Sequence, residues 1–489
     1  MFDESIVRPG RRKKLSALLP AGRFLCCDDI VARGCQDDPD ACRPGDVYVA
    51  RSTAADDGEA GVLRALARGA AGVVAERMVV TQGRPLCLVP DAEWAFSRLC
   101  HAFAGDPATA LRVIAISGTS GKTTTTWLTA SVLAEAGLQV GVLSDLGCLD
   151  GTSTAPERAT YRSPRGLAAW LSRLADSGCT HAVIEVSSRM LTRQVLAGVP
   201  CAAVVVTNLD VAHLDLHGTP AAYHAIKTRI LDAVTPGGCL IAPPGSGSLG
   251  RLRRRARQAG IEIVTAGLTP AAAVTAEPLD RSLHGQTFLL RTAAAAVPVA
   301  IGTPVTSFVR DAVLAAAVGG RCGVPLERIA RGIESAGSVA GRMERIDRGQ
   351  DVPVFIDAPT SLHAASATLA CLRRLTPRRL VAVAEERWTR AVGLGTSAAW
   401  LDRWCDASLV VPTTMMTDAA GDHDIAAYAR IDRLLDGLGA DDCLIVLGGP
   451  GLPGGGPPGP DDGEFALVDV IDGWFQLANP PGSAGRRAA

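Results

Sequence analysis

The stretch GTSGKTTT, from Gly118 to Thr125, decides how the chain around it folds. It follows the apolar run LRVIAIS (111–117) and precedes WLTASVLAEAG (127–137), which has the composition of a helix. This order predicts a buried strand, a glycine-rich loop and a helix. Glycines let backbone N–H groups close around phosphate oxygens, the helix start adds positive potential, and Lys122 supplies a compact charge. The sequence therefore predicts a site for a nucleoside triphosphate.

The spacing of this loop narrows the prediction. The common pattern GxxxxGK[ST] would place a glycine at Ile116, whereas the first glycine here is Gly118. The shorter form GTxGKTT is the more selective signal. The loop residues that we expect to bind the nucleotide are Gly118, Thr119, Ser120, Gly121, Lys122, Thr123 and Thr124.

Lysine is rare in this chain, which otherwise uses arginine for positive charge. Of 49 Lys and Arg residues, only Lys13, Lys14, Lys122 and Lys227 are lysines. A compact ammonium suits the phosphate contact predicted for Lys122. Lys227 lies in YHAIKTRIL, and its primary amine can react with CO₂ to give a carbamate, which arginine cannot do. The alternative is a surface lysine without a chemical role.

Length and composition describe a globular protein. The 489 residues suggest about three domains, and 47% hydrophobic residues suffice for buried cores. A net charge of −1 gives no global attraction to nucleic acid or membranes, and the basic runs at 11–14 and 251–257 are expected to be solvated. No run of 18 apolar residues occurs, so we expect a cytoplasmic protein without membrane insertion, and a monomer.

The 14 cysteines contain no CxxC pair. This pattern is not typical of a zinc ribbon, a redox motif or a disulfide scaffold. We expect most of them to be buried, reduced thiols.

Strand and helix patterns divide the chain into three α/β domains. Residues 1–108 alternate short apolar runs with turns and predict a small α/β domain. Residues 109–340 repeat strand, loop and helix, which predicts a doubly wound parallel sheet around the phosphate loop. In such sheets ligands bind at the carboxyl ends of strands, where Glu185 and Asn208 also fall. Residues 341–489 predict an α/β, Rossmann-like domain with a flexible stretch at 448–464 and a disordered tail.

Three blocks in this order resemble one family. They are GTSGKTTT (118–125), EVSS (185–188) and TNLDVAHLDLHGTPAAYHAIK (207–227), and together they resemble the Mur ligases, most of all the MurE type. The resemblance is weak in the first domain, strong over 111–232 and patchy from 341 onward. It implies a first domain for the UDP sugar, a middle domain for ATP and Mg²⁺, and a last domain that closes over ATP and an amino acid.

The resemblance also implies an activity. Such a ligase forms an acyl phosphate from ATP and a carboxylate, then an amide with an amino acid, here on a UDP-N-acetylmuramoyl peptide. The product serves peptidoglycan synthesis, and with it cell-wall biogenesis, cell shape and cell division. By this resemblance the catalytic residues are Lys122, Lys227 and His213, and the metal ligands are Thr123, Glu185, His213 and carbamylated Lys227. It also implies that Asn208, Arg342 and Asp357 bind the nucleotide and that Ser163, Ser187 and Arg193 bind the substrate.

Several family positions have changed. Arg162, Ser163 and Pro164 stand where the family has Thr-Thr-Pro, the residues before the PGD turn lack Ser-Arg, and Phe308 and Asp311 replace two amides near the adenine. In the third domain the family's DYAHTPD is DAPTSLH (357–363), and its DNPR motif is missing. Two alternatives therefore stay open: a non-catalytic paralogue that binds nucleotide or a partner ligase, and a relative of folylpolyglutamate synthase. A zinc site of His213, His217 and His224 is a third, weaker alternative.

Overall fold

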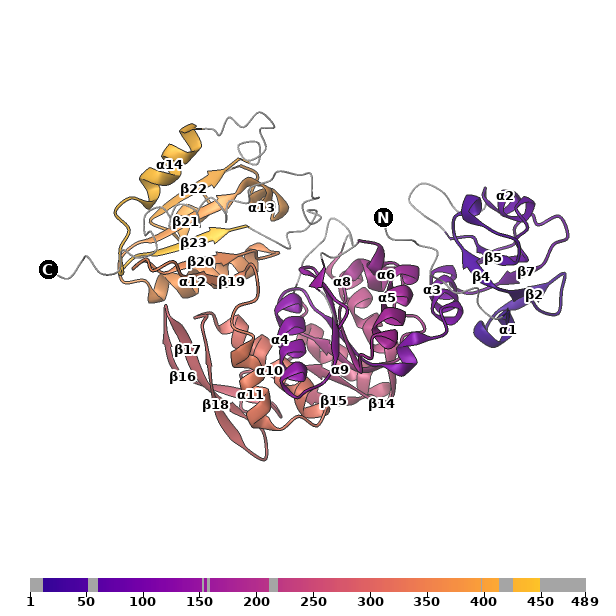
Figure 1. Ribbon diagram of the computed structural model, residues 1–489, viewed down its shortest axis with the longest axis horizontal. Helices are drawn as coiled ribbons and strands as arrows, with labels where there is room; N and C mark the ends of the chain where they lie inside the picture. The colour runs from indigo at the N-terminus through magenta and orange to yellow at the C-terminus, as the bar shows by residue number, and fades with distance from the viewer. Residues whose placement is uncertain are drawn as a thin grey trace.

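The computed structural model describes residues 12–51, 60–151, 154–155, 159–210, 219–396, 398–412 and 425–448. Three α/β units follow one another along the chain, and Figure 1 shows the central unit between the first and the third. The predicted α/β class with three domains is confirmed. Of the proposed limits, position 108 lies in η2 (Pro107–Ala110), which precedes β8 (Arg112–Ser117), and position 340 lies just before β19 (Arg342–Ile346).

The first unit is built on a five-stranded sheet in the order β2-β7-β6-β5-β4. Strands β4 (Gly34–Gln36), β5 (Asp46–Val49), β6 (Gly72–Ala75) and β7 (Leu86–Leu88) are parallel, and β2 (Arg23–Leu25) pairs antiparallel with β7. Helix α3 (Ala92–Phe103) begins at Asp91, whose carboxylate accepts from the N–H of Trp94. The other elements of the first unit are β1 (Lys13–Lys14), α1 (Leu15–Leu18), β3 (Val31–Ala32), η1 (Pro39–Ala41), α2 (Val62–Ala67) and η2 (Pro107–Ala110).

The central unit holds an eight-stranded sheet in the order β11-β10-β9-β12-β8-β13-β14-β15. Six of these strands are parallel, and β10 and β11 add an antiparallel edge. The strands are β8, β9 (Val140–Ser144), β10 (Gly147–Leu149), β11 (Thr154–Ala155), β12 (His181–Glu185), β13 (Cys201–Val206), β14 (Val234–Ala242) and β15 (Glu262–Thr265).

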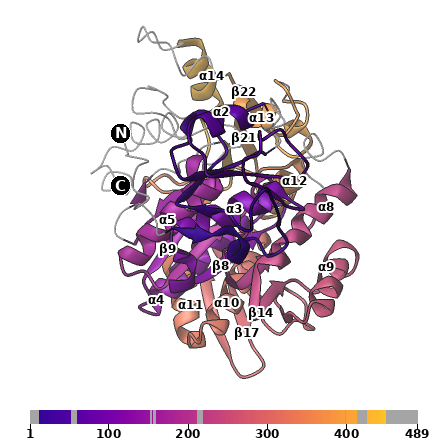
Figure 2. The same ribbon diagram turned by 90° about the vertical axis from the view of Figure 1, so that its right-hand side faces the viewer.

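Helices cover both faces of this sheet. Alternate residues of β8 face opposite cores: Ile114 packs with α4 (Lys122–Glu135), α10 (Thr306–Arg321) and α11 (Leu326–Ser335), and Val113 packs with the helices of the other face. The helices of that face are α5 (Pro164–Asp176), α6 (Ser188–Thr192) and α9 (Gly247–Gln258). Residues of η3 (Ala159–Arg162), α8 (Pro220–Thr228) and η4 (Arg229–Ala233) pack into the same core. The predicted doubly wound sheet is confirmed, and Figure 2 shows its strands β8, β9 and β14 behind the first unit.

A three-stranded antiparallel sheet was not predicted from the sequence. It consists of β16 (Thr275–Ser282), β17 (Gly285–Arg291) and β18 (Ala296–Ile301), with β17 in the middle. Pro278 and Pro298 interrupt the strand pattern, and both lie on edge strands, where a missing N–H is tolerated.

The third unit is a five-stranded sheet in the order β19-β20-β23-β21-β22. Strand β19 is antiparallel to β20 (Val354–Asp357), and β21 (Leu380–Glu385), β22 (Ala407–Val411) and β23 (Cys443–Leu447) are parallel to β20. Its helices are α12 (Leu362–Leu375), α13 (Glu386–Ala391), η5 (Leu401–Arg403) and α14 (Ile425–Leu435). The α/β class predicted for this domain is confirmed. The flexible stretch and tail predicted from 448 onward lie, beyond Gly448, outside the described residues.

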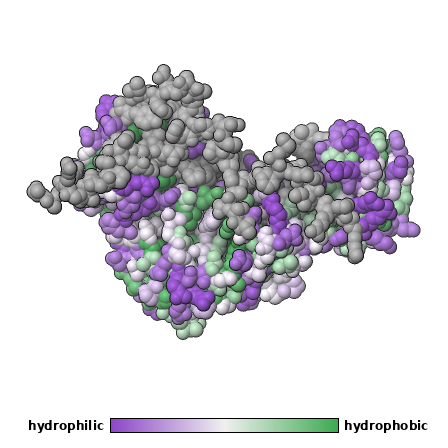
Figure 3. Space-filling model, in the orientation of Figure 1, coloured by the Kyte–Doolittle hydropathy of each residue, from purple (hydrophilic) through white to green (hydrophobic). Residues whose placement is uncertain are grey.

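Burial agrees with most expectations about the surface. Arg251, Arg254, Arg255 and Arg257 on α9 are exposed, as expected of a solvated basic run. The 14 cysteines are all free thiols, and ten of them are buried. Within the described ranges no helix is both long and apolar enough to cross a membrane, and Figure 3 shows hydrophilic residues over much of the first unit.

Candidate functional site

The phosphate loop lies between β8 and α4 and depends on two glycines. Gly118 has φ +152° and Gly121 has φ +78°, where L side chains are strained. A Cβ at Gly118 would overlap the hydroxyl of Thr207, and a Cβ at Gly121 would overlap the carboxyl group of Asp311. The loop therefore packs directly against β13 and α10, and larger residues would displace it.

Asn208 fixes the backbone of the phosphate loop by hydrogen bonds. Its Oδ1 accepts from the N–H groups of Thr119 and Ser120, both at 3.1 Å, and its Nδ2 donates to the carbonyl of Ser120 at 3.0 Å. Thr207 Oγ1 also donates to Ser120 O at 2.6 Å. Asn208 thus shapes the loop, and the N–H groups at the start of α4 have no partner within the helix.

Glu185 meets the loop at the end of β12. Thr123 Oγ1 donates to its Oε2 at 2.9 Å, and Lys122 Nζ lies 3.8 Å from its Oε1. Glu185 is 1% exposed, and its Oε1 has no hydrogen-bond partner among the described residues. Burial, together with the charge of Asp145, raises the pKa of Glu185 to about 7, although Lys122 acts in the opposite direction. A buried carboxylate oxygen in this position can take a cation.

Asp145 and Arg162 complete this cluster, and sequence reasoning missed them as site residues. Asp145 directly follows β9, and its N–H donates to Glu185 Oε2 at 3.1 Å. Arg162 pairs with Asp145 Oδ1. Burial raises the pKa of Asp145, but Arg162 and Lys122 outweigh it and bring the pKa to about 2. The signal that could have found Asp145 is its place at the carboxyl end of a predicted parallel strand.

Lys227 is a residue of α8 that lies beside the phosphate loop, and its exposed fraction is 3%. Its Nζ donates to Ser117 Oγ at 3.1 Å and to Gly118 O at 3.0 Å. Burial, with Lys122 next, lowers the pKa of Lys227 well below its usual range, so the neutral amine is favoured. The alternative of a surface lysine is wrong. A neutral amine is the form that reacts with CO₂.

Two of the three predicted substrate residues cap helices. Ser163 Oγ accepts from Gly166 N at 3.1 Å and begins α5, and Ser187 Oγ accepts from Met190 N at 3.2 Å and begins α6. Arg193 directly follows the last residue of α6. Burial raises the pKa of Glu93 in the first unit, and the charge of Arg193 opposes this shift. All three lie on the side of the central unit nearest to the first.

Arg342 and Asp357 are brought together in the third unit. Arg342 begins β19, and its NH1 donates to Ala358 O at 2.7 Å. Asp357 ends β20 and accepts from Met343 N at 3.3 Å and Thr368 Oγ1 at 3.1 Å. Burial raises the pKa of Asp357 to about 6, against the charge of Arg342.

His213 and His217 lie outside the described residues. The described residues contain no group of three or more His, Cys, Asp or Glu that could hold a metal ion. The zinc alternative therefore gains no support from them. A magnesium site that shares phosphate oxygens needs fewer protein ligands.

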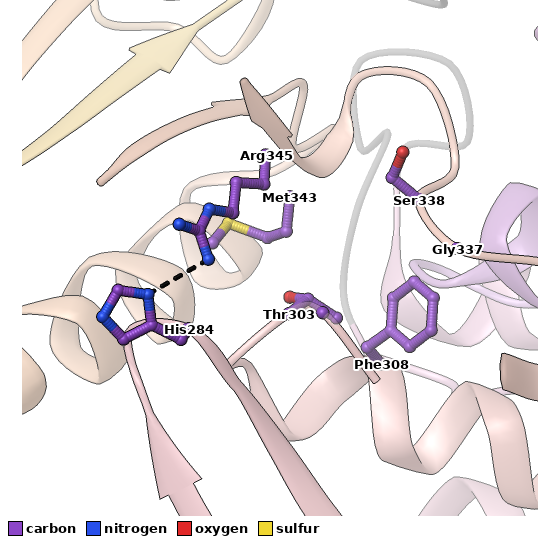
Figure 4. A pocket seen from close by; sticks show the side chains of 8 residues that line it. His284, Thr303, Phe308, Gly337, Ser338, Met343 and Arg345 are labelled. Atoms are coloured by element: carbon purple, nitrogen blue, oxygen red, sulfur yellow. Dashed lines mark hydrogen bonds between the residues drawn. The ribbon is translucent and has the colours of Figure 1, made fainter. Parts of the chain in front are cut away.

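A cavity of about 220 Å³ lies between the central and third units. Its lining residues are His284, Gly302, Thr303, Phe308, Gly337, Ser338, Met343 and Arg345. Figure 4 shows Arg345 and His284 facing one another, joined at 3.2 Å, with Phe308 on the opposite side. Thr303 Oγ1 and Arg345 Nε are buried and have no hydrogen-bond partner among the described residues.

The cavity is close to the phosphate loop along α10. Phe308 lies one helical turn before Asp311, whose carboxyl group adjoins Gly121. Helix α10 therefore contributes one residue to the cavity and another to the packing of the phosphate loop.

Comparison with known proteins places the chain in a family. Residues 116–319 match the Mur ligase middle domain. The chain is 32% identical over 362 residues to the UDP-N-acetylmuramyl-tripeptide synthetase of Roseiflexus sp., and the match covers 71% of each chain. It belongs to the Mur ligase family. This Mur ligase is also 30% identical over 412 residues to the UDP-N-acetylmuramoyl-L-alanyl-D-glutamate--2,6-diaminopimelate ligase of Geobacter metallireducens, covering 81% of this chain and 77% of the relative.

Solved structures agree with the fold of this Mur ligase. A UDP-N-acetylmuramoyl-L-alanyl-D-glutamate--2,6-diaminopimelate ligase gives a TM-score of 0.68 at 21% identity, covering 90% of this chain and 94% of that chain. MurF ligase from Thermotoga maritima in complex with ADP gives 0.57 at 16% identity, covering 91% and 99%. The apo form of L. casei FPGS gives 0.56 at 16% identity, covering 72% and 91%. The shared fold alone does not distinguish these activities.

Proposed function

We propose that this Mur ligase is an ADP-forming ligase that joins an amino acid to a carboxylate of a UDP-N-acetylmuramoyl peptide, with ATP and Mg²⁺. The observation that carries the proposal is the cluster at the phosphate loop, where Lys122 and Thr123 meet buried Glu185 above buried Lys227. The relatives at 30% to 32% identity are named for this class of reaction. We place the reaction in the cytoplasm, in a monomer, as a step toward peptidoglycan.

The nucleotide would lie along α10. Its phosphates would bind the N–H groups at the start of α4 and the ammonium group of Lys122. Its base would enter the cavity against Phe308, where Thr303 Oγ1 and Arg345 Nε offer polar contacts. Arg342 and Asp357 would reach the nucleotide from the third unit when the two units close.

The residues around Glu185 fit a magnesium ion. Glu185 Oε1 is a buried oxygen without a hydrogen-bond partner among the described residues, and the hydroxyl of Thr123 lies beside the same carboxylate. Thr123, Glu185, His213 and carbamylated Lys227 are the residues that would hold the ion. Mg²⁺ would supply positive charge that offsets the repulsion between the γ-phosphate and the acceptor carboxylate.

The reaction has two displacements. A carboxylate oxygen of the acceptor forms a bond to the γ-phosphorus while the bond from that phosphorus to the β,γ-bridging oxygen breaks, and ADP leaves. The amine of the amino acid then forms a C–N bond at the acyl carbon, phosphate leaves with the C–O bond pair, and the amine proton passes to solvent. Lys122 would stay on the phosphate oxygens through the first displacement.

The acceptor would lie between the first and central units, near Ser163, Ser187 and Arg193. Arg165, in the first turn of α5 after Ser163, donates to Cys35 O at 2.9 Å and to Gln36 Oε1 at 2.8 Å in the first unit, so the start of α5 lies on this side. The incoming amino acid would bind the third unit, whose motifs differ from those of diaminopimelate-adding relatives. We therefore expect a different amino acid there.

The test is ADP release by the purified protein. The assay contains Mg²⁺-ATP, UDP-N-acetylmuramoyl-L-alanyl-D-glutamate and a panel of amino acids. We expect turnover that needs both the acceptor and one amino acid, and loss of at least 100-fold in Lys122→Ala. Lys14→Ala, which changes an exposed lysine of the first unit, is the matched control and should retain full activity.

The alternatives give different results in the same assay. ATP binding without turnover on any pair of substrates would contradict a ligase and favour a non-catalytic paralogue. Turnover with folate and glutamate would favour the folylpolyglutamate synthase alternative. The altered third unit is the observation behind the first alternative, and the shared fold is the observation behind the second.

A further inference from the structure

Arg162 extends the phosphate-loop cluster toward the first unit. Its guanidinium pairs with Asp145, the N–H of Asp145 donates to Glu185 at 3.1 Å, and Glu185 accepts from Thr123 at 2.9 Å. Only Asp145 and Glu185 therefore separate Arg162 from the loop hydroxyl that would hold Mg²⁺. Lys122 would serve the phosphates, so Arg162 is a further cation beside this cluster that can act on the acceptor together with Mg²⁺ and Arg193.

The backbone at Arg162 is fastened on both sides. Arg173 NH2 donates to Tyr161 Oη at 2.6 Å, and the Arg173 guanidinium stands 4.9 Å from the centre of the Tyr161 ring. On the other side Ser163 caps α5 through Gly166 N. These contacts fix the residues next to Arg162, so its side chain is directed toward Asp145 at little further entropic cost.

We propose that Arg162 binds the acceptor carboxylate that receives the phosphoryl group. A guanidinium is planar and carries five N–H donors, so it can hold a second carboxylate beside Asp145. The acceptor carboxylate would then lie between Arg162 and the γ-phosphate held by Lys122. This assignment rests on the proposed function and adds a specificity-determining residue to it.

The charge of Arg162 acts where two anions must approach. It offsets the charge of the carboxylate before attack and remains beside the acyl oxygen as the new O–P bond forms. A purely structural Arg162 would do something different, since it would only keep Asp145 and the loop in place. Its loss would then weaken nucleotide and acceptor alike, whatever the charge of the acceptor.

The experiment compares two acceptors that differ in one group. One is UDP-N-acetylmuramoyl-L-alanyl-D-glutamate, and the other carries a carboxamide in place of the attacking carboxylate. Binding of each is measured by calorimetry in the presence of Mg²⁺ and ADP, so turnover is not needed. We expect wild type to prefer the acid by about 10- to 100-fold, and Arg162→Gln to bind acid and amide within about twofold of one another.

Control variants separate binding from folding. Arg255→Gln removes another ion-paired arginine, on α9, and should keep the wild-type preference. Arg162→Lys keeps the positive charge but lacks the planar guanidinium with its paired N–H donors, so it should retain only part of the preference for the acid. If Arg162→Gln does not fold, this variant tests whether Arg162 binds the acceptor carboxylate. ADP should bind Arg162→Gln as it binds wild type.

Each remaining outcome overturns a stated claim. If Arg162→Gln, alone or together with Arg162→Lys, keeps the wild-type preference for the acid, the proposed role of Arg162 is wrong. Equal weakening of acid, amide and ADP shows a structural arginine and does the same. A wild type that binds neither acceptor overturns the proposed function itself, whereas a wild type that binds both equally overturns only the assignment of Arg162.

Discussion

At the scale of single residues, the site holds two lysines in different surroundings. Lys122 Nζ lies 3.8 Å from Glu185 Oε1, whereas Lys227 is buried and donates to Ser117 and Gly118. Burial lowers the pKa of Lys227, so the amine is available as a nucleophile toward CO₂. The carbamate would carry a negative charge, and the released proton would pass to solvent. The same residue type can therefore serve as a cation and as a precursor of an anion.

The first prediction concerns Lys227. Lys227→Ala should lose ligase activity by at least 100-fold, because the anion that would help to hold Mg²⁺ is missing. Lys227→Arg should be equally inactive, since a guanidinium does not form the carbamate. Acetate or formate added to Lys227→Ala should restore part of the ADP release. Full activity of Lys227→Arg would show that the reaction needs no carbamate at this position.

At the scale of elements, the starts of helices and the ends of strands position the site. Helix α3 fastens the first unit to the central one: Ser97 Oγ donates to Val195 O at 3.0 Å, and His101 Nε2 lies 3.2 Å from the same carbonyl. His101 Nδ1 is buried without a hydrogen-bond partner among the described residues. Burial lowers the pKa of His101 to about 4. A protonated ring would place a second N–H where nothing described accepts it.

The second prediction follows from the depressed pKa of His101. Above pH 6.5 the ring is neutral in both states, so the packing of α3 keeps its full stability. Between pH 6.5 and about 4 only the unfolded state takes up the proton, and stability falls by as much as roughly 3 kcal/mol. Amide exchange in α3 should therefore accelerate, after correction for intrinsic rates, from pH 7.5 to pH 5.

His101→Gln is the matching control. Glutamine can still donate to Val195 O but has no proton to gain in this range. Its α3 amides should show the same protection at pH 5 and pH 7.5. Equal acceleration in wild type and His101→Gln would mean that other groups control the docking of α3.

Particular elements also show how far sequence reasoning reaches. The phosphate loop, its flanking strand and helix, and the strand ends at Glu185 and Asn208 follow from local patterns, and they lie together in the fold. Ser163 and Ser187 could have been recognised as helix caps, since Ser-Pro at 163–164 is a typical helix start. Arg162 and Asp145 meet only through tertiary structure, because 17 positions of chain separate them. No local pattern encodes such a pair.

At the scale of the whole molecule, the fold has been kept while contacts have changed. The fold covers 94% of a solved UDP-N-acetylmuramoyl-L-alanyl-D-glutamate--2,6-diaminopimelate ligase at 21% identity, yet the sequence of the third unit lacks the DNPR motif. A shared fold does not fix the substrate, so we expect residues between the central and third units to contribute to specificity. The cavity lies at this junction, with Thr303 and Phe308 from the central unit and Met343 and Arg345 from β19.

The third prediction concerns this junction. A base in the cavity would touch both units at once, so ADP should slow amide exchange in β19 and in the turn between β16 and β17 together. Phe308→Ala removes the aromatic wall, and we expect it to weaken ADP binding by about 10-fold, measured by calorimetry. It should also abolish the protection of β19 at an ADP concentration that saturates wild type. Leu279→Ala, an exposed change on β16 outside the cavity, should alter neither result. If ADP protected only the phosphate loop and α4, the base would lie elsewhere, and the two units would close without it.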